Sequence, residues 1–294
     1  MHYDFSLIIQ GILGYGVTII VALGFQLVFS TSRMFHFAYI GLYSLIIYMA
    51  YWAQGLSMPL YAQILIGTAT AVAATAVMEY LVYRPMRKRG SSPLVILIAS
   101  LGMLTALQNG IALGFGSQPV ILTTPHFLAG KFVIGGFALS RLEFAQIIAD
   151  VLMFAIIFVI LRWTGFGILV RGVADDANRS GMMGVDVNRV IIAVLVMGTL
   201  MLVPVAILDG MNTGATPYGG TTTLLVASII AFVGGIGSIS GTMIVGLLAG
   251  IISGVSLLIV PSEWTVLIVF AALLLAILAR PIGIMSSVKG RRTV

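Results

Sequence analysis

Residues 34–78 read MFHFAYIGLYSLIIYMAYWAQGLSMPLYAQILIGTATAVAATAVM and contain no Asp, Glu, Lys or Arg over 45 positions. A transmembrane helix needs about 20 consecutive, mostly apolar residues to cross the hydrocarbon layer of a bilayer. This stretch therefore predicts two consecutive membrane-spanning helices, near residues 35–54 and 60–82.

Three further uncharged runs have the same character: Phe5–Ser32, Gly90–Gly130 and Gly210–Ser262. Of the 294 residues, 60% are hydrophobic and 8% charged, whereas soluble domains have about 25% charged residues. We therefore exclude a soluble protein and expect an all-α, polytopic membrane protein that forms a single domain over residues 1–294. About nine transmembrane helices (eight to ten) are predicted, near 6–29, 35–54, 60–82, 93–114, 143–161, 190–208, 222–236, 241–259 and 264–279. The segments 222–236 and 264–279 are short, as for re-entrant or tilted helices.

The positions of Lys and Arg predict the orientation, because cytoplasmic segments carry an excess of both. With nine alternating spans, only Lys131 and Arg141 fall on the outer side. The other 13 of the 15 basic residues are Arg33, Arg84, Arg87, Lys88, Arg89, Arg162, Arg171, Arg179, Arg189, Arg280, Lys289, Arg291 and Arg292. We therefore expect the N-terminus outside, the C-terminus in the cytoplasm, and no nucleic-acid partner, since the net charge of +6 is distributed over membrane loops. The N-terminus also lacks the basic start of a cleavable signal peptide.

The sequence offers little for catalysis. Cysteine is absent, which excludes thiol chemistry and disulfides, and the GxxxxGK[ST], HExxH and GxSxG motifs do not occur. We expect a transporter subunit and not an enzyme, with no cofactor or metal bound by this chain. Any energy for transport must then come from a partner.

A few polar residues fall inside or beside the predicted spans, where polar groups are costly and are therefore candidates for function. The predicted translocation path comprises His36, Tyr39, Tyr43, Gln108, Asn109, Asp209 and Asn212. Structural alternatives are open: Asp209 suits a turn or helix cap, His36 suits packing, and tyrosines near a membrane surface often act as anchors.

Residues 234–241, GGIGSISG, contain four glycines: Gly234, Gly235, Gly237 and Gly241. One interpretation is close helix packing, since glycines four residues apart let helix backbones approach each other in lipid. The other is a helix break at a functional bend, because irregular backbone at membrane depth is tolerated only where protein or a water-filled cavity covers it.

Two predicted loops are long: an outer loop over 115–142 and an inner loop over 162–189. In the inner loop, Asp175 or Asp176 can cap a short helix, and Gly184 can end it in the left-handed conformation. Met182 and Met183 would lie on a cytoplasmic helix with no core of its own. Flexible methionines suit an adaptable protein contact; the alternative is a helix that lies on the membrane surface.

A series of short motifs, in order from about residue 17 to 285, resembles the permease subunits of ABC importers for branched-chain amino acids, the Liv type. The matching segments are RPMR at 84–87, SPL at 92–94, LG at 101–102, QN at 108–109, FGS at 115–117, RWTG at 162–165, VADD at 173–176, MGVD at 183–186, RV at 189–190, GGIGSISG at 234–241 and RPIG at 280–283.

The resemblance implies an ABC importer permease fold in a bacterial or archaeal cytoplasmic (inner) membrane. Its implied partners are a second homologous permease, two cytoplasmic ATPase subunits that bind ATP and Mg²⁺, a periplasmic or extracellular substrate-binding protein, and membrane lipid. It also implies a coupling helix over 172–184 that is seated in a groove of the ATPase. The implied ATPase-coupling residues are Asp175, Asp176, Arg179, Met182, Met183 and Gly184.

The cargo implied by the resemblance is a small metabolite such as an amino acid, an amide or an organic acid. Three positions depart from the family pattern: NRS at 178–180 replaces acid-Ala-Ala, HFAYI at 36–40 replaces Asn-Phe-Ala-His-Gly, and Asp209 replaces an apolar or small residue. The alternative function is a stand-alone secondary transporter or channel for a small solute. That function predicts membrane-embedded charges for ion coupling, and the spans contain few.

Overall fold

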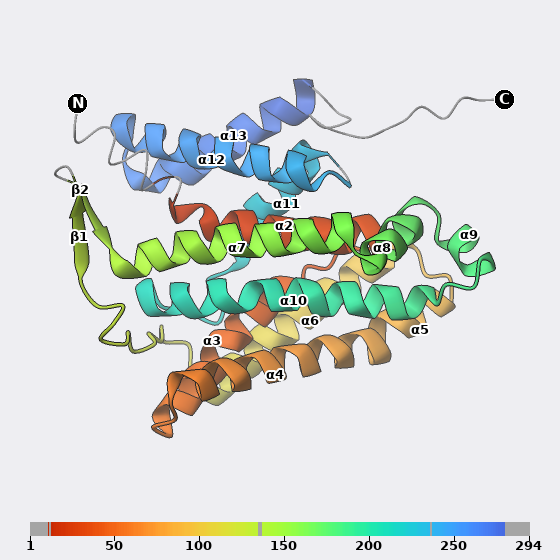
Figure 1. The fold of residues 1–294 in the computed structure, drawn as a ribbon, viewed down its shortest axis with the longest axis horizontal. Coiled ribbons are helices and arrows are strands. Elements are labelled where there is room, and N and C mark those ends of the chain that lie inside the picture. The colour runs from red at the N-terminus through yellow and green to blue at the C-terminus, as the bar shows by residue number, and fades with distance from the viewer. Residues whose placement is uncertain (1–10, 12, 135–136, 236, 280–294) are drawn as a thin grey trace.

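The computed structural model describes residues 11, 13–134, 137–235 and 237–279, which are mainly helical (Figure 1). Most of the long helices lie side by side along the long axis of the molecule. The helices are α2 (Gly16–Ser32), α3 (Tyr39–Gly55), α4 (Leu60–Met78), the π-helix η1 (Glu79–Tyr83), α5 (Arg84–Lys88), α6 (Pro93–Phe115), α7 (Arg141–Trp163), α8 (Gly165–Asp175), α9 (Ala177–Met182), α10 (Val187–Asn212), α11 (Thr221–Gly234), α12 (Ile239–Ile259) and α13 (Ser262–Ala279). Two strands, β1 (Lys131–Ile134) and β2 (Phe137–Ser140), precede α7.

Each of the nine predicted spans overlaps a helix, although residues 6–10 and 12 of the first span lie outside the described residues. The expectation of a polytopic helical protein is confirmed. Within the described residues, five helices are long and apolar enough to cross a bilayer alone. They are α6, α7, α10, α12 and the continuous helix Leu60–Lys88, which comprises α4, η1 and α5. Helix α11 has 14 residues, or about 21 Å at ~1.5 Å per residue, and is shorter than the ~30 Å hydrocarbon layer. The number of complete crossings stays a prediction.

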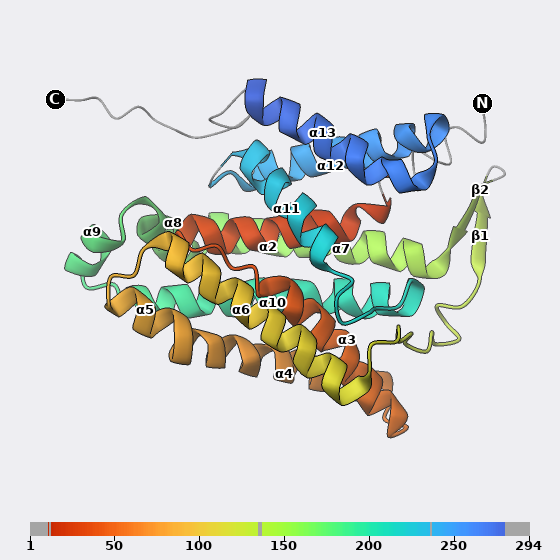
Figure 2. The ribbon, with the colours of Figure 1, turned by 180° about the vertical axis from the view of Figure 1, so that it is seen from behind.

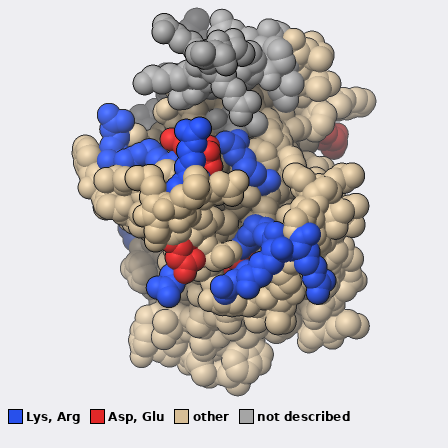
Figure 3. Space-filling model, turned by 90° about the vertical axis from the view of Figure 1, so that its right-hand side faces the viewer, with Lys and Arg blue, Asp and Glu red and all other residues tan. Residues whose placement is uncertain are grey.

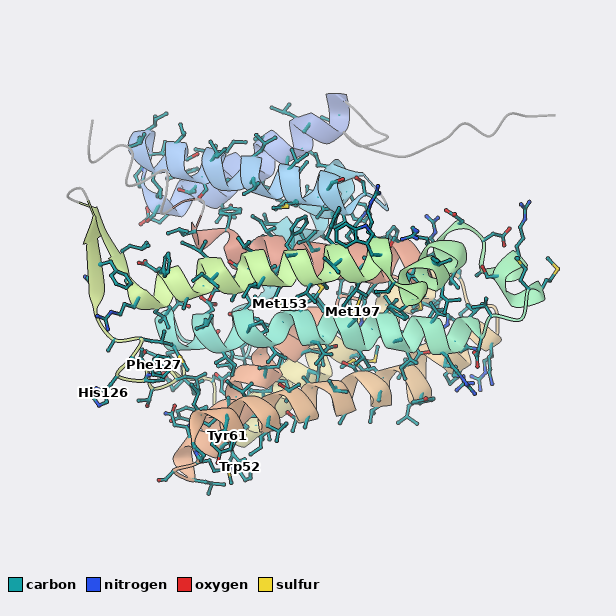
Figure 4. The ribbon with its side chains drawn as sticks, in the orientation of Figure 1. Trp52, Tyr61, His126, Phe127, Met153 and Met197 are labelled. Carbon is teal, nitrogen blue, oxygen red and sulfur yellow. The ribbon has the colours of Figure 1, made fainter. Side chains whose placement is uncertain are left out.

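Helices α2 and α10 form the centre of the bundle (Figure 2). Helix α10 packs against α2, α3, α4 and α7, and 67% of its apolar span is buried, against 11% for α7. Met153 of α7 and Met197 of α10 lie where these two helices meet (Figure 4). Because α7 exposes most of its apolar surface, that surface must face lipid or another subunit in a membrane.

Close packing of α2, α3 and α10 depends on small residues. Tyr39 of α3 is fully buried, and its hydroxyl donates a hydrogen bond to the carbonyl of Gly198 on α10 at 2.8 Å. A Cβ at Gly24 of α2 would overlap that hydroxyl. In lipid, no hydrophobic driving force brings helices together. The bundle is therefore stabilised by such close packing and by hydrogen bonds between helices.

The two ends of the bundle differ in charge. One end carries α5, α8 and α9, and we call it the basic end (Figure 3). Nine of the eleven described Lys and Arg residues lie in or next to α5, α8, α9 and the adjoining ends of α2, α7 and α10: Arg33, Arg84, Arg87, Lys88, Arg89, Arg162, Arg171, Arg179 and Arg189. Lys131 and Arg141 lie at the opposite end, beside the strands, which we call the hairpin end.

The predicted outer loop, 115–142, contains regular structure that an all-α description omits. Strands β1 and β2 pair antiparallel, with Lys131 opposite Ser140. Gly135 and Gly136, which separate the strands in the sequence and are typical hairpin residues, lie outside the described residues. Helix α7 begins directly after β2 with a capping box between Ser140 and Glu143, which satisfies free N–H groups at the helix start.

Exposed aromatic side chains gather at the hairpin end. Figure 4 shows Trp52 and Tyr61 around the α3–α4 turn, and His126 and Phe127 in the loop before β1. Trp52, Tyr61 and Phe127 are all exposed. Aromatic residues of this kind are typical of the level where a bilayer meets water, so this end is expected to lie at a membrane surface.

We expect Gly24→Ala to destabilise the protein and Gly102→Ala, on α6, to leave its stability unchanged or raised. A methyl group at Gly24 overlaps the Tyr39 hydroxyl, and overpacking of this kind costs about 1–3 kcal/mol. Gly102 has no atom within 4 Å of an added Cβ. The temperature at which the purified subunit in detergent loses its monodisperse elution peak measures both effects. An equal temperature for the two variants would contradict the packing argument.

Candidate functional site

A cavity of about 350 Å³ lies in the half of the bundle nearer the hairpin end. The starts of α2, α3 and α11, the end of α10 and the segment 214–220 form its walls. Figure 2 shows that α3 and α11 start part-way along the bundle, not at its end. Gly220 permits this arrangement, because a Cβ there would overlap the side chain of Ile40. The volume is within the range of pockets that take small molecules.

Asp209 is the acidic residue of the cavity wall. The buried Tyr43 donates its hydroxyl hydrogen to Oδ2 of Asp209, and Thr213 donates to Oδ1 at 3.0 Å. A carboxylate has about four acceptor positions, so two remain available. No Lys, Arg or His lines the described part of the cavity. This wall therefore favours a cation or an N–H donor.

Of the predicted path residues, the structure brings only Tyr43 and Asp209 together in this cavity. Tyr39 holds α3 against α10 instead. Asn212 is exposed and does not line the cavity. Asp209 also has the predicted turn geometry, since its backbone carbonyl accepts from the N–H of Thr213, so the two interpretations of Asp209 are compatible.

His36 lies away from the cavity, in a buried polar cluster. Its Nδ1 is 2.7 Å from the hydroxyl of Tyr83, which donates to Ser100 at 3.0 Å. The Ser100 hydroxyl in turn accepts from the N–H of Ala38. His36 therefore joins the α2–α3 connection to η1 and α6, which favours the structural interpretation of this residue.

Gln108 and Asn109 contact the segment that forms one side of the cavity. Gln108 donates to the hydroxyl of Thr221 at 3.3 Å, and Tyr218 donates to Asn109 at 3.1 Å. These bonds position the start of α11 against α6. Both residues therefore support the cavity from outside and do not line it.

Sequence reasoning missed four threonines that line the cavity, and it also missed Asp150 of α7. The threonines are Thr18, Thr213, Thr216 and Thr223. Asp150 lies in a second, smaller cavity of about 120 Å³ that is otherwise apolar. Gln146 donates to Oδ1 of Asp150 at 3.1 Å, and Oδ2 lies against Gly16 of α2. Its signal was a single charged residue in the mostly apolar segment 144–161.

Within the glycine-rich segment 234–241, residues 235–238 separate α11 from α12. Helix α11 ends at Gly234. After it, the backbone of Gly235 has a φ of 100° and that of Gly237 a φ of 87°. Ser238 then caps α12, because its hydroxyl accepts a hydrogen bond from the N–H of Gly241 at 3.0 Å. Gly234 and Gly241 touch, since a Cβ on either would overlap the backbone of the other. The break and the close packing that the sequence suggested thus occur in the same segment.

Gln26 of α2 covers this break. Its side-chain amide donates to the carbonyl of Gly235 at 2.8 Å, and the bond is buried. A backbone carbonyl without a helical partner is costly inside a membrane. Gln26 therefore supplies the partner that the broken helix lacks.

The predicted coupling helix over 172–184 is wrong as a single element, because the chain forms two helices there. Helix α8 ends at Asp175, and Asp176 starts α9 by accepting from the N–H of Arg179 at 3.0 Å. The extended backbone of Asp176, with φ −155° and ψ 103°, separates the two helices. Asp175 is the last residue of α8, whereas Asp176 has the capping role that the sequence allowed for either residue.

Helix α9 ends in the geometry expected for Gly184. Gly184 has φ of 89°, its N–H bonds to the carbonyl of Gly181, and the N–H of Val185 bonds to the carbonyl of Ser180. These two bonds define a Schellman motif. Met182 and Met183 are 81% and 85% exposed, so α9 presents two large apolar side chains at the basic end.

Comparisons with known proteins identify relatives over most of the chain. The family described as "Branched-chain amino acid transport system / permease component" matches residues 7–278. The chain is 30% identical over 281 residues to the high-affinity branched-chain amino acid transport system permease protein LivH of Escherichia coli (strain K12), and 31% identical over 281 residues to LivH of Salmonella typhimurium. It is 29% identical over 283 residues to BraD of Pseudomonas aeruginosa. Each alignment covers 90% of both chains. No solved structure shows a significant match.

We expect Gln26→Leu to destabilise the protein by about 1–3 kcal/mol, because it leaves the buried carbonyl of Gly235 without a partner. Ser30→Ala on the same helix is the matched control, since Ser30 donates only to its own helix, at Leu27. Unfolding of the purified subunit followed by circular dichroism in detergent measures both. A Gln26→Leu variant as stable as Ser30→Ala would contradict this role.

Proposed function

We propose that this chain, which belongs to the family of branched-chain amino acid transport system permease components, carries a small metabolite across the inner membrane through the cavity beside Asp209. The chain is a multi-pass permease subunit of an ATP-binding-cassette importer. The proposed cargo is an amino acid, an amide or an organic acid. The observation that supports transport driven by a separate ATPase subunit is helix α9, which is capped, exposes two methionines and has no core of its own.

The proposed complex contains a second homologous permease, two cytoplasmic ATPase subunits and an external substrate-binding protein. ATP and Mg²⁺ would bind to the ATPases, and this chain would serve as a transport subunit without catalysis of its own. The basic end would face the cytoplasm, with the N-terminus outside and the C-terminus inside, because Lys and Arg collect on the cytoplasmic side of membrane proteins.

Helix α9 is joined to the cavity by a short set of contacts. Only the segment 183–186 separates α9 from α10, and α10 carries Asp209 near its other end. Arg33, after α2, donates to the carbonyl of Ala174 in α8 at 3.1 Å. Since α2 and α10 both line the cavity, movement of α8 and α9 by an ATPase would be passed to both walls.

Arg87 adds a second link at the basic end. It donates to both carboxylate oxygens of the buried Glu79, and to Asn188 at the start of α10 at 3.4 Å. The ion pair joins η1 to α5, and the hydrogen bond from Arg87 to Asn188 joins α5 to the start of α10. Breaking such a buried pair is expensive, so α4 and α10 are expected to move together at this end.

A stand-alone secondary transporter is the second candidate, and the acids at membrane depth favour it. Asp150 and Asp209 lie on different helices near the start of α2, and embedded carboxyl groups are typical of ion coupling. We expect proteoliposomes that contain this chain, its homologous permease and the ATPases, with the substrate-binding protein outside, to accumulate cargo only with internal ATP. Accumulation by this chain alone under an ion gradient would favour the second candidate instead.

We expect replacement of Met182 and Met183 by Asp to abolish ATP-dependent uptake while the protein still inserts into the membrane. Two charges in an apolar docking contact are strongly unfavourable, and neither residue belongs to the core. The double replacement by Leu keeps the apolar surface and should retain most uptake. Co-purification of the ATPase with each variant measures docking directly. Uptake by the Asp variant equal to that of the unaltered chain would contradict the proposed contact.

A further inference from the structure

Three basic residues at the basic end have no acidic partner. Arg84 and Lys88 lie in α5, and Arg89 follows it. Within the described residues, none of the three forms an ion pair, and the Nε of Arg84 is buried without a hydrogen-bond partner. The neighbouring Arg87 differs, because the buried Glu79 neutralises it. Arg84, Lys88 and Arg89, which we call the α5 cations, therefore present positive charge that the protein does not balance.

The helix surface that leads to the α5 cations is apolar. Val77, Tyr80 and Leu81 are all exposed there, and only 28% of the apolar span within Leu60–Lys88 is buried. Contacts between helices in lipid favour small side chains, whereas these three side chains are large. This surface therefore suits lipid hydrocarbon better than another helix.

Tyr80 marks the depth of the membrane surface on this helix. The Cζ of Arg84 lies 5.6 Å from the centre of the Tyr80 ring, within the distance at which a guanidinium group is attracted to an aromatic face. Tyrosine is typical of the level where a bilayer meets water, and basic side chains near a helix end extend to the same level. The α5 cations are therefore placed among the lipid headgroups.

The start of α6 forms the other side of the same surface. Residues 89–92 connect α5 to α6, and Figure 2 shows both helices at the basic end. Leu94, Val95 and Ile98 at the start of α6 are exposed, and 28% of the apolar span of α6 is buried. Positive charge thus lies at the edge of two apolar surfaces, the arrangement that a lipid with a negative headgroup matches.

We propose that the α5 cations bind the headgroup of an anionic phospholipid, whose acyl chains lie along the exposed surfaces of α4 and α6. Each Lys or Arg near an anionic membrane surface strengthens binding by about fivefold. A lipid is favoured over an acidic protein because the apolar surfaces continue up to the cations. The inference goes beyond the proposed function, since it requires only that α4 and α6 lie in a bilayer and says nothing of the cargo or the ATPase.

Native mass spectrometry of the delipidated full chain in detergent measures this site. The probes are dioleoylphosphatidylglycerol, which is anionic, dioleoylphosphatidylcholine, whose ammonium group offsets its phosphate, and inorganic phosphate at constant ionic strength. We expect the anionic lipid to bind at least about tenfold more tightly than the zwitterionic one, and phosphate not to displace it. Equal affinity for the two lipids would overturn the inference. Displacement by phosphate would show a site for free phosphate and overturn the assignment to a lipid.

A matched pair of double variants locates the site. Lys88→Gln with Arg89→Gln should weaken phosphatidylglycerol by about tenfold or more and leave phosphatidylcholine unchanged. Both side chains are exposed, so the fold should not depend on them. The control is Arg179→Gln with Arg189→Gln, which removes the same charge from the basic end, but from arginines that pair with Asp176 and Asp186. An equal loss in the two double variants would show that net charge alone sets the preference, and would overturn the site.

Arg84→Gln tests the half-buried member of the site. It should weaken phosphatidylglycerol by about fivefold, against no change for Arg189→Gln, provided that both variants elute as single monodisperse peaks. If Arg84→Gln does not fold, the double variants decide the question. If every variant at the α5 cations binds phosphatidylglycerol like the unaltered chain but no longer co-purifies with the ATPase, these residues contact a protein and the lipid site is wrong.

Discussion

Backbone polar groups inside a bilayer must find partners within the protein, because the hydrocarbon layer contains no water to replace them. This constraint explains why the described chain is mainly helical and why its irregular segments are covered. Where α11 breaks from α12, Gln26 donates to the free carbonyl of Gly235. Where α3 begins part-way along the bundle, the hydroxyl of Ser100 accepts from the N–H of Ala38. At the start of α11, beside the cavity, no side chain caps the helix, and the N–H groups of Thr222 and Thr223 have no partner among the described residues.

The helices have little hydrophobic reason to associate in lipid, so close contact has to come from shape and hydrogen bonds. Gly24 lets Tyr39 reach Gly198, and Gly220 lets the start of α11 approach Ile40. The same close packing that holds α2, α3 and α10 together also leaves a cavity between their ends. The stability of the bundle and the position of the site therefore both depend on small residues at helix contacts.

The molecule has two functional ends joined by long helices. At the basic end, α9 exposes Met182 and Met183 and is tied to α2 through Arg33 and α8. At the hairpin end, α10 presents Asp209 to the cavity. Because α10 extends between both ends with its core residues buried, it can transmit a displacement more readily than a flexible loop.

The sequence alone determined the helical membrane class, the approximate positions of the hydrophobic helices that the structure describes and the collection of Lys and Arg at one end. These features depend on composition and on residues near one another in the chain. The cap that Asp176 provides for α9 and the turn at Gly184 depend on neighbouring residues in the same way. Tertiary structure decided which polar residues meet. Asp209 joins Tyr43 across 166 residues, whereas His36 and Tyr39 turn to other partners. It also decided that Thr18 and the start of α11 face one cavity, and that α8 and α9 are separate helices. Such pairings depend on the angles at which helices cross and on where each helix begins along the bundle axis. Local sequence does not specify either, because in lipid the contacts between helices are set by the packing of small residues and not by apolar burial.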